Sequence, residues 1–311
     1  MKTASPRVSV SILTYNQREV IGQAIDSVLA QQVDFPYEII IGDDYSTDGT
    51  REVLEEYRRR HPELIHLILH PRRYEDEVPG RTNNMTNLAC CRGEYTAMLD
   101  GDDYWTDPDK LQRQYDRLEA NPDLVMCLHN STIVYEGTGG RELNGSTIME
   151  QGSIRQSGVY THQDIAKLRL GVQIHSIMFR TRAFEYFPDW FNDVVPADNA
   201  LMLLLSQRGD FYYDTRPQAV YRVTGEGFVS AYATDYELTL RRLEDVELFA
   251  REFPDTYLPV LRQKPYAYLY FRLLKRALVT GRPIVAVRHL FNVLVRDPLY
   301  PIAALRGRLA R

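Results

Sequence analysis

Residues 94–105 read EYTAMLDGDDYW, an apolar run that passes directly into three aspartates within four positions. Residues 95–99 have the length and composition of a buried strand. Asp100, Asp102 and Asp103 follow where that strand ends. In an open α/β sheet, ligands bind beyond the carboxyl ends of the strands. The stretch therefore predicts a buried central strand with a polar site at the edge of its sheet.

Strand-like and helical segments alternate on both sides of this turn, as is typical of a mostly parallel sheet covered by helices. We expect strands at residues 8–14, 38–42, 65–69, 95–99, 124–129, 171–180, 211–214 and 219–223, and helices at 20–29, 50–60, from Asp107 onward, and at 199–208. A Gly-, Ser- and Thr-rich stretch from 130 to 161 predicts a hairpin or mobile loop. The prediction is an α/β domain over residues 1–232, with halves 1–130 and 131–232, followed by a helical extension over 233–311.

The charges are unevenly distributed along the chain. Residues 261–311 hold eleven Lys and Arg against a single acidic residue, which leaves 26 basic and 41 acidic side chains in the remainder. An acidic body argues against nucleic-acid binding, because phosphate neutralisation needs a basic face. A basic tail suits an anionic membrane surface better.

The cysteines and the apolar runs bear on location. Three cysteines without metal-ligand spacing indicate reduced thiols in a cytosolic protein. The N-terminus has no stretch of signal-peptide length, and no uncharged run reaches the roughly 20 residues that span a bilayer. We therefore expect a cytoplasmic protein that reaches the membrane only peripherally.

The aspartates of the turn predict a metal site. A close pair of like charges costs ~4 kcal/mol at the dielectric of a protein surface, and a divalent cation removes that cost. Mg²⁺ takes one or two protein carboxylates and fills its remaining positions with water and substrate phosphates. The turn thus predicts a metal–diphosphate site for Mn²⁺ or Mg²⁺. The alternative is a solvated acidic turn or a helix cap, a role that Asp107 also fills.

Four motifs in this order resemble those of family 2 glycosyltransferases: SVSILTYN at 9–16, DDYSTDGT at 43–50, RGEY at 92–95 and DGDDYW at 100–105. The resemblance covers about residues 6–230. It implies a GT-A fold, an inverting mechanism and a UDP-, GDP- or dTDP-linked sugar donor. The first half of the domain would then bind the nucleotide sugar, and the second half the acceptor.

The resemblance also implies roles for individual residues. Those implied to bind the nucleotide sugar are Thr14, Tyr15, Asn16, Asp44, Arg81, Asp100 and Asp102. Asp44 would accept hydrogen bonds from the base, and Asp100 would face the ribose. The resemblance implies Asp102 and Asp103 as the residues that bind the divalent ion. Arg81, expected in the loop before residue 95, is either a base or diphosphate contact or a solvated arginine. Tyr45 stands where glycine is common in the family, which either narrows the base pocket or reshapes its turn.

Inverting transfer needs a carboxylate that takes the proton of the acceptor hydroxyl. Asp198 occupies the family position for this base, and the alternative is an N-cap for a helix that starts at Asn199. His175 is either an acceptor contact or a core histidine. Trp105 either stacks on a sugar or anchors the following helix.

Two other classes of protein remain as alternatives. A sugar nucleotidyltransferase normally carries a Gly-rich, basic segment after its first strand, where this chain has Thr14–Gln17. A non-catalytic nucleotide-sugar-binding or scaffold protein has no need of Asp102, Asp103 and Asp198.

The acceptor is expected to be a glycan or a lipid-linked sugar of polysaccharide biosynthesis. The aromatic residues Tyr266, Tyr268, Tyr270 and Phe271, together with basic residues up to position 276, suit a membrane surface. The alternative is a pair of helices that packs on the catalytic body or on a second subunit.

Overall fold

In the computed structural model, parallel strands that end at a common edge form the core of the chain. The structure describes residues 5–74, 80–136, 145–151, 154–167, 173–183, 187–194, 197–223, 235–261, 264–298 and 301. Two compact units divide at Gly227 and Phe228. The first unit carries the sheet, and the second is helical.

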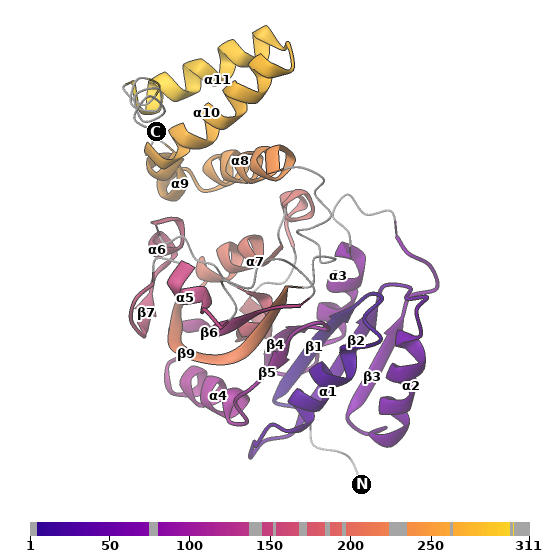
Figure 1. The fold of residues 1–311 in the computed structure, drawn as a ribbon. Helices are drawn as coiled ribbons and strands as arrows, with labels where there is room; N and C mark the ends of the chain where they lie inside the picture. The colour runs from indigo at the N-terminus through magenta and orange to yellow at the C-terminus, as the bar shows by residue number, and fades with distance from the viewer. Residues whose placement is uncertain are drawn as a thin grey trace. The chain divides into compact units, whose positions relative to one another are not determined.

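Nine strands of the described residues form one mixed sheet in the order β3-β2-β1-β4-β8-β6-β9-β5, with β7 paired to β9 (Figure 1). The strands are β1 Val8–Thr14, β2 Tyr37–Asp43, β3 Ile65–Leu69, β4 Tyr95–Asp100, β5 Tyr104–Trp105, β6 Leu124–Tyr135, β7 Gly158–Tyr160, β8 Met178–Arg180 and β9 Asp210–Val223. Strands β1 to β4 pair in parallel. The antiparallel β8 joins this half to the parallel pair β6 and β9. This is the expected GT-A-type mixed α/β fold.

The helices of the first unit are α1 Ile21–Leu29, α2 Thr50–Arg60, α3 Arg81–Cys90, α4 Lys110–Ala120, α5 Ile148–Gln151, α6 His162–Lys167 and α7 Ala197–Ser206. The apolar face of β1 carries Val8, Val10 and Ile12, which pack in one core with Ile21 and Ile25 of α1. Fully buried contacts of this kind stabilise the fold by roughly 1.5–3 kcal/mol per side chain. Helix α1 therefore covers one face of the parallel strands.

The opposite face of β1 is buried but polar, and it packs against α3. Asn87 of α3 donates from Nδ2 to Ser11 Oγ at 2.9 Å and to the Ile12 carbonyl at 3.0 Å. Asn83 donates to the Gly42 carbonyl at 2.9 Å. A Cβ at Gly42 would lie 2.2 Å from Asn83 Oδ1, so only glycine lets the helix approach this closely. Helix α3 was not predicted, and the loop expected around Arg81 is wrong.

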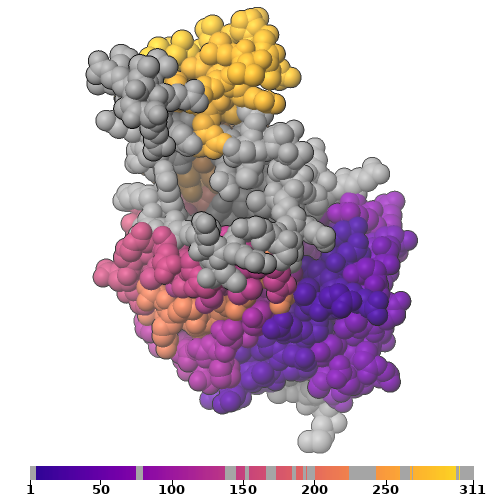
Figure 2. Space-filling view, viewed as in Figure 1, coloured from indigo at the N-terminus to yellow at the C-terminus, as the bar shows by residue number. Residues whose placement is uncertain are grey.

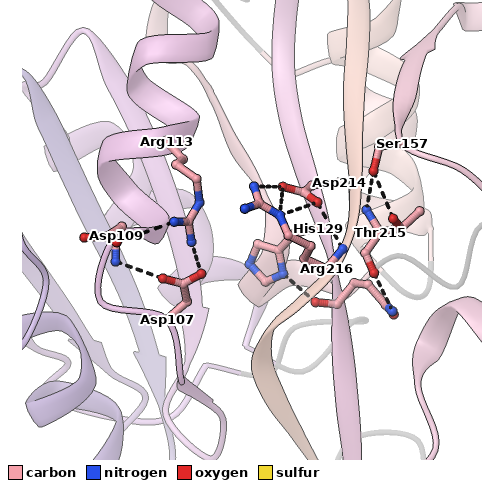
Figure 3. Close-up of polar contacts among 9 residues, drawn as sticks. Asp107, Asp109, Arg113, His129, Ser157, Asp214, Thr215 and Arg216 are labelled. Atoms are coloured by element: carbon pink, nitrogen blue, oxygen red, sulfur yellow. Dashed lines mark hydrogen bonds and ion pairs between the residues drawn. The ribbon is translucent and has the colours of Figure 1, made fainter.

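Strands β6 and β9 are longer than predicted. The two segments expected at 211–214 and 219–223 form the single strand β9, and β6 continues to Tyr135 into the stretch expected to be a loop. Their pairing shifts register around Asn130. Polar contacts hold this bend, where Asp214 pairs with Arg216 and Ser157 bonds to Thr215 (Figure 3).

Two other segments begin or end differently from the prediction. Of the strand expected at 171–180, the structure has β8 preceded by a 3₁₀ helix, Ile174–Ser176. Helix α4 begins at Lys110, after a turn in which Asp107 accepts from the backbone N–H of Asp109 and pairs with Arg113 (Figure 3).

The second unit contains α8 Asp235–Glu252, α9 Pro254–Leu261, α10 Lys264–Val279 and α11 Pro283–Arg296. Helices α10 and α11 form a hairpin whose core includes Tyr270, Phe271 and Val293. Tyr270 and Phe271, two of the aromatic residues that suited either a membrane surface or packing on protein, are buried in this core, which is the packing alternative for these two side chains. Within the described residues, no helix combines the length and the apolar character that crossing a membrane requires.

Candidate active site at the carboxyl edge of the sheet

Three neighbouring strands end side by side. Thr14 of β1 is in register with Asp43 of β2, and Leu13 is in register with Asp100 of β4. Because these strands are parallel, the turns that follow them lie at one edge of the sheet. The structure thus brings together the segments at 14–16, 43–50 and 100–105.

The aspartates that follow β2 have different surroundings. Asp43 has no exposed surface, and its Oδ2 accepts from Arg51 Nε at 2.6 Å and from the Ser46 backbone N–H at 3.0 Å. Asp44 donates its backbone N–H to the Thr14 carbonyl at 3.0 Å. Its carboxylate lies 3.9 Å from Arg73 Nε. Asp43 therefore holds the turn, whereas Asp44, which is also buried, lies beside Arg73.

Arg73 is a site residue that the sequence analysis missed. Its Nη1 donates to the Tyr15 hydroxyl at 2.9 Å, and its guanidinium lies 4.0 Å from the centre of the Tyr15 ring. Tyr15, Arg73 and Asp44 thus form one aromatic and charged group from three strand ends. The available signal was position, because Arg73 follows β3, the fourth parallel strand that ends at this edge.

The turn after β2 stores backbone strain. Tyr45 has φ 66°, a left-handed conformation that costs a residue with a Cβ roughly 1–2 kcal/mol. Its ring is 40% exposed and lies 5.1 Å from the Arg51 guanidinium carbon. Asn16, which also has positive φ, accepts the Thr47 N–H at 2.9 Å and donates its own N–H to Ser46 Oγ at 2.8 Å. Tyr45 therefore occupies the left-handed conformation that glycine adopts most easily, and Asn16 ties this turn to the end of β1.

The acidic turn after β4 gathers three carboxylates. Asp100, Asp102 and Asp103 each place an oxygen within 4.8 Å of the others. Gly101 lets the turn pack on β1, since a Cβ there would lie 2.4 Å from Gln17 Oε1 and 3.0 Å from the Leu13 carbonyl. The predicted cluster is thus a compact group at the end of a buried strand.

Both oxygens of Asp103 are bonded inside the protein. Oδ1 accepts the Arg222 backbone N–H at 2.8 Å, and Oδ2 lies 2.6 Å from His175 Nδ1. His175 has no exposed surface, and its Nε2 lies 2.7 Å from Ser131 Oγ. This geometry makes His175 a positioning residue for Asp103. The burial of His175 does not favour contact with an acceptor, which stays a prediction. The expectation that His175 lies on a strand is wrong, because it belongs to the 3₁₀ helix Ile174–Ser176.

Arg222 fixes the turn from a distant part of the chain. Besides the backbone bond to Asp103, its side chain donates to the Asp102 carbonyl, to Gln23 Oε1 at 2.6 Å and to Glu136 Oε1 at 2.9 Å. The Arg222 side chain is only 4% exposed. Strand β9 therefore clamps the acidic turn against α1 and the end of β6.

Asp102 is the partly exposed member of the adjacent pair. Burial, followed by the charge of Asp103, raises the pKa of Asp102 to about 6. A raised carboxyl pKa means that negative charge is disfavoured where it stands. A hard cation with oxygen-ligand preference would relieve this cost, so the donor set fits Mg²⁺ or Mn²⁺.

The remaining predicted residues lie in different environments. Arg81 is buried at the start of α3, where Nη2 donates to the Val194 carbonyl at 2.8 Å and the guanidinium lies 4.6 Å from the Phe191 ring. Trp105 is 4% exposed and donates from Nε1 to the His175 carbonyl at 2.9 Å, the position of an anchor in the core.

Asp198 was predicted as the catalytic base. Helix α7 starts at Ala197, so Asp198 lies inside the first turn and is not the N-cap of a helix at Asn199. Its side chain falls outside the described residues.

A mixed sheet with an acidic turn after its fourth strand is the arrangement of a GT-A glycosyltransferase. Residues 9–189 match the model of glycosyl transferase family 2, and the chain belongs to this family.

Curated relatives agree with this assignment. The chain is 32% identical over 229 residues to the uncharacterized protein Rv1520 of Mycobacterium tuberculosis, covering 73% of this chain and 62% of that protein. It is 38% identical over 139 residues to TuaG of Bacillus subtilis, named as a teichuronic acid biosynthesis glycosyltransferase, covering 44% of this chain and 52% of TuaG. The chain thus spans less than two thirds of the length of either relative.

Solved structures show the same fold. S. aureus TarS 1-349 in complex with UDP-GlcNAc aligns with a TM-score of 0.58 at 18% identity, covering 96% of this chain and 92% of that one. The mannosyltransferase PcManGT from Pyrobaculum calidifontis, in complex with GDP-Man and Mn²⁺, aligns with a TM-score of 0.56 at 20% identity, covering 99% and 81%.

Proposed function

We propose that the chain is an inverting, metal-dependent glycosyltransferase that moves one sugar from a nucleotide-sugar donor to a hydroxyl of a glycan or lipid-linked acceptor. The observation that carries this proposal is the acidic turn, where Asp103 is held by Arg222 and His175 while Asp102 is left partly exposed. Such a turn presents a carboxylate in a fixed direction.

Three groups at the edge have distinct tasks in this proposal. Tyr15, Arg73 and Asp44 bind the base, with Thr14 and Asn16 bordering its pocket, and Asp100 binds the ribose. Asp102, supported by Asp103, holds the divalent ion. When bound, Mn²⁺ or Mg²⁺ neutralises the charge that develops on the departing nucleoside diphosphate. The structurally similar proteins that were solved with UDP-GlcNAc and with GDP-Man and Mn²⁺ support a nucleotide-sugar donor and a divalent ion.

Asp198 is the proposed base. Its carboxylate takes the acceptor proton while the acceptor oxygen attacks the anomeric carbon and the bond from that carbon to the diphosphate oxygen breaks. The configuration at the anomeric carbon is inverted. The name of TuaG, which refers to teichuronic acid biosynthesis, supports an acceptor in polysaccharide biosynthesis. We also propose that the enzyme acts on the cytoplasmic side of the membrane.

The test combines nucleotide binding with turnover. Melting temperatures are measured with UDP, GDP and dTDP, each with and without Mn²⁺, and hydrolysis of the corresponding nucleotide sugars follows. We expect one nucleotide to raise the melting temperature in a metal-dependent way, because a ligand that binds only the folded state stabilises it.

Asp102→Asn should abolish that shift, and Asp116→Asn on the exposed face of α4 is the matched control. Metal-dependent binding without hydrolysis of any sugar would favour a non-catalytic binding protein. The absence of any nucleotide shift would refute the proposal.

A further inference from the structure

Helix α11 leaves an apolar surface uncovered. Its buried residues Ala286, His289 and Val293 face α10, at helical spacing. The opposite side carries a second apolar row, here called the outer face of α11, which consists of Ile284, Val287, Phe291, Leu294 and Val295. A helix that is apolar on both sides calls for an apolar neighbour on each.

The exposure of this outer face is large. Ile284 is 85% exposed and Phe291 is 66% exposed. At the hairpin turn, Leu278 and Val279 of α10 are exposed as well, at 62% and 81%. Figure 2 shows part of this hairpin on the molecular surface, in yellow. Contiguous apolar surface of this kind marks a protein or membrane interaction site.

The charges around the outer face select the partner. Arg282 and Arg288 of α11 and Lys275 and Arg276 of α10 are exposed, and residues 261–311 contain Asp297 as their single acidic residue. In a two-fold dimer the same patch faces itself, so these cations would meet cations. Anionic lipid headgroups would instead neutralise them, while the acyl boundary accepts the apolar row.

We propose that the outer face of α11 docks on an anionic membrane, with the helix lying in the plane of the interface. A helix of 14 residues is too short to span the bilayer, which needs about 20. It matches the interfacial geometry, in which an apolar face sinks roughly 5–10 Å and basic residues stay at the headgroups. This inference does not depend on the catalytic proposal.

Flotation of the full chain tests the docking. Vesicles of phosphatidylcholine with phosphatidylglycerol are compared with phosphatidylcholine alone, at low and high salt. We expect binding to the anionic vesicles that weakens with salt. Phe291→Glu should reduce the partition coefficient by more than about tenfold. The substitution removes an aromatic ring that the membrane would bury, and it adds a negative charge that the anionic lipids repel. Arg288→Gln should reduce the partition coefficient by about fivefold.

Val159→Glu is the matched control, because Val159 is 58% exposed on β7 of the first unit. It should bind vesicles as the unchanged protein does. Far-UV circular dichroism and thermal melting report whether each variant is folded, and Val287→Glu repeats the test one turn away from Phe291. Failure of the unchanged protein to float with anionic vesicles overturns the proposal. Unchanged flotation of both Phe291→Glu and Val287→Glu overturns it as well. A dimer in light scattering that Phe291→Glu dissociates, without vesicle binding, would instead make this face a subunit interface.

Discussion

The turns after β2 and β4 each carry two adjacent aspartates, and in each pair the two residues have opposite tasks. Asp43 and Asp103 are buried and accept two contacts each inside the protein. Asp44 lies beside Arg73, and Asp102 is partly exposed in the acidic cluster. Adjacent acidic residues in the sequence therefore do not form a pair of equal ligands, because one anchors the turn and its neighbour is directed by it.

The largest expected effect separates Asp102 from its neighbours in activity. Asp102→Asn should lower transfer or donor hydrolysis by about 1,000-fold, since it removes the carboxylate proposed to hold the ion that stabilises the leaving group. Asp44→Asn should mainly weaken nucleotide binding, by about tenfold. Steady-state kinetics with saturating Mn²⁺ compare the two. Equal losses in both variants would break the distinction between them.

The two aspartates that anchor the turns, Asp43 and Asp103, should matter for stability instead. Asp43→Asn removes one partner of the buried contact with Arg51 and should lower the free energy of unfolding by about 3 kcal/mol. Asp103→Asn should act similarly through Arg222 and His175. Chemical denaturation measures both, with Asp116→Asn on the exposed face of α4 as the control, for which we expect a loss below about 1 kcal/mol. An Asp43→Asn variant as stable as this control would contradict the anchoring role of Asp43.

In metal-free protein, Asp102→Asn should change the free energy of unfolding in the opposite direction from Asp43→Asn. The pKa of Asp102 is raised to about 6 by burial and by Asp103, so the folded state disfavours the charged carboxylate at neutral pH. Asp102→Asn should therefore raise the free energy of unfolding by about 2 kcal/mol at pH 7 in the presence of a chelator. This gain should shrink as the pH falls through about 6 and vanish only below about 4, where Asp102 becomes neutral in the unfolded state as well. A gain that does not change with pH would exclude this origin.

The smallest effect tests the strained residue beside the first pair. Tyr45→Gly should be more stable than Tyr45→Ala by about 1 kcal/mol, because alanine keeps the cost of the left-handed backbone and glycine does not. At most helical or extended positions the order is reversed. Thermal denaturation of the two variants decides the sign. If alanine is the more stable, φ at Tyr45 is not positive in solution.

The sequence predicted the strands and helices whose buried side chains are apolar. Residues 8–14 form β1 as expected, and the strands ending near Asp43 and Asp100 were located correctly because their cores are apolar runs. Helix α3 was not predicted because most of its buried residues are asparagines, of which Asn83 and Asn87 donate hydrogen bonds to β2 and β1. Hydrophobic periodicity cannot detect a helix that packs through amides.

The site was predicted in its composition but not in its supports. The family resemblance pointed to Asp44, and the acidic cluster pointed to Asp102 and Asp103, whereas neither argument pointed to Arg73 or Arg222. The clamp by Arg222 depends on the register of β9, which was read as two shorter strands. Long-range contacts of this kind need the sheet order, which local pattern does not contain.

The contact between Arg222 and the Asp102 carbonyl joins residues 120 positions apart. During synthesis on the ribosome, the acidic turn emerges long before Arg222, so the turn lacks this contact until the rest of the domain has been made. The same dependence limits transplantation: a graft of residues 100–105 into another protein would carry the aspartates but not their orientation. Completion of the site thus coincides with completion of the domain, which keeps partial chains from presenting an assembled centre.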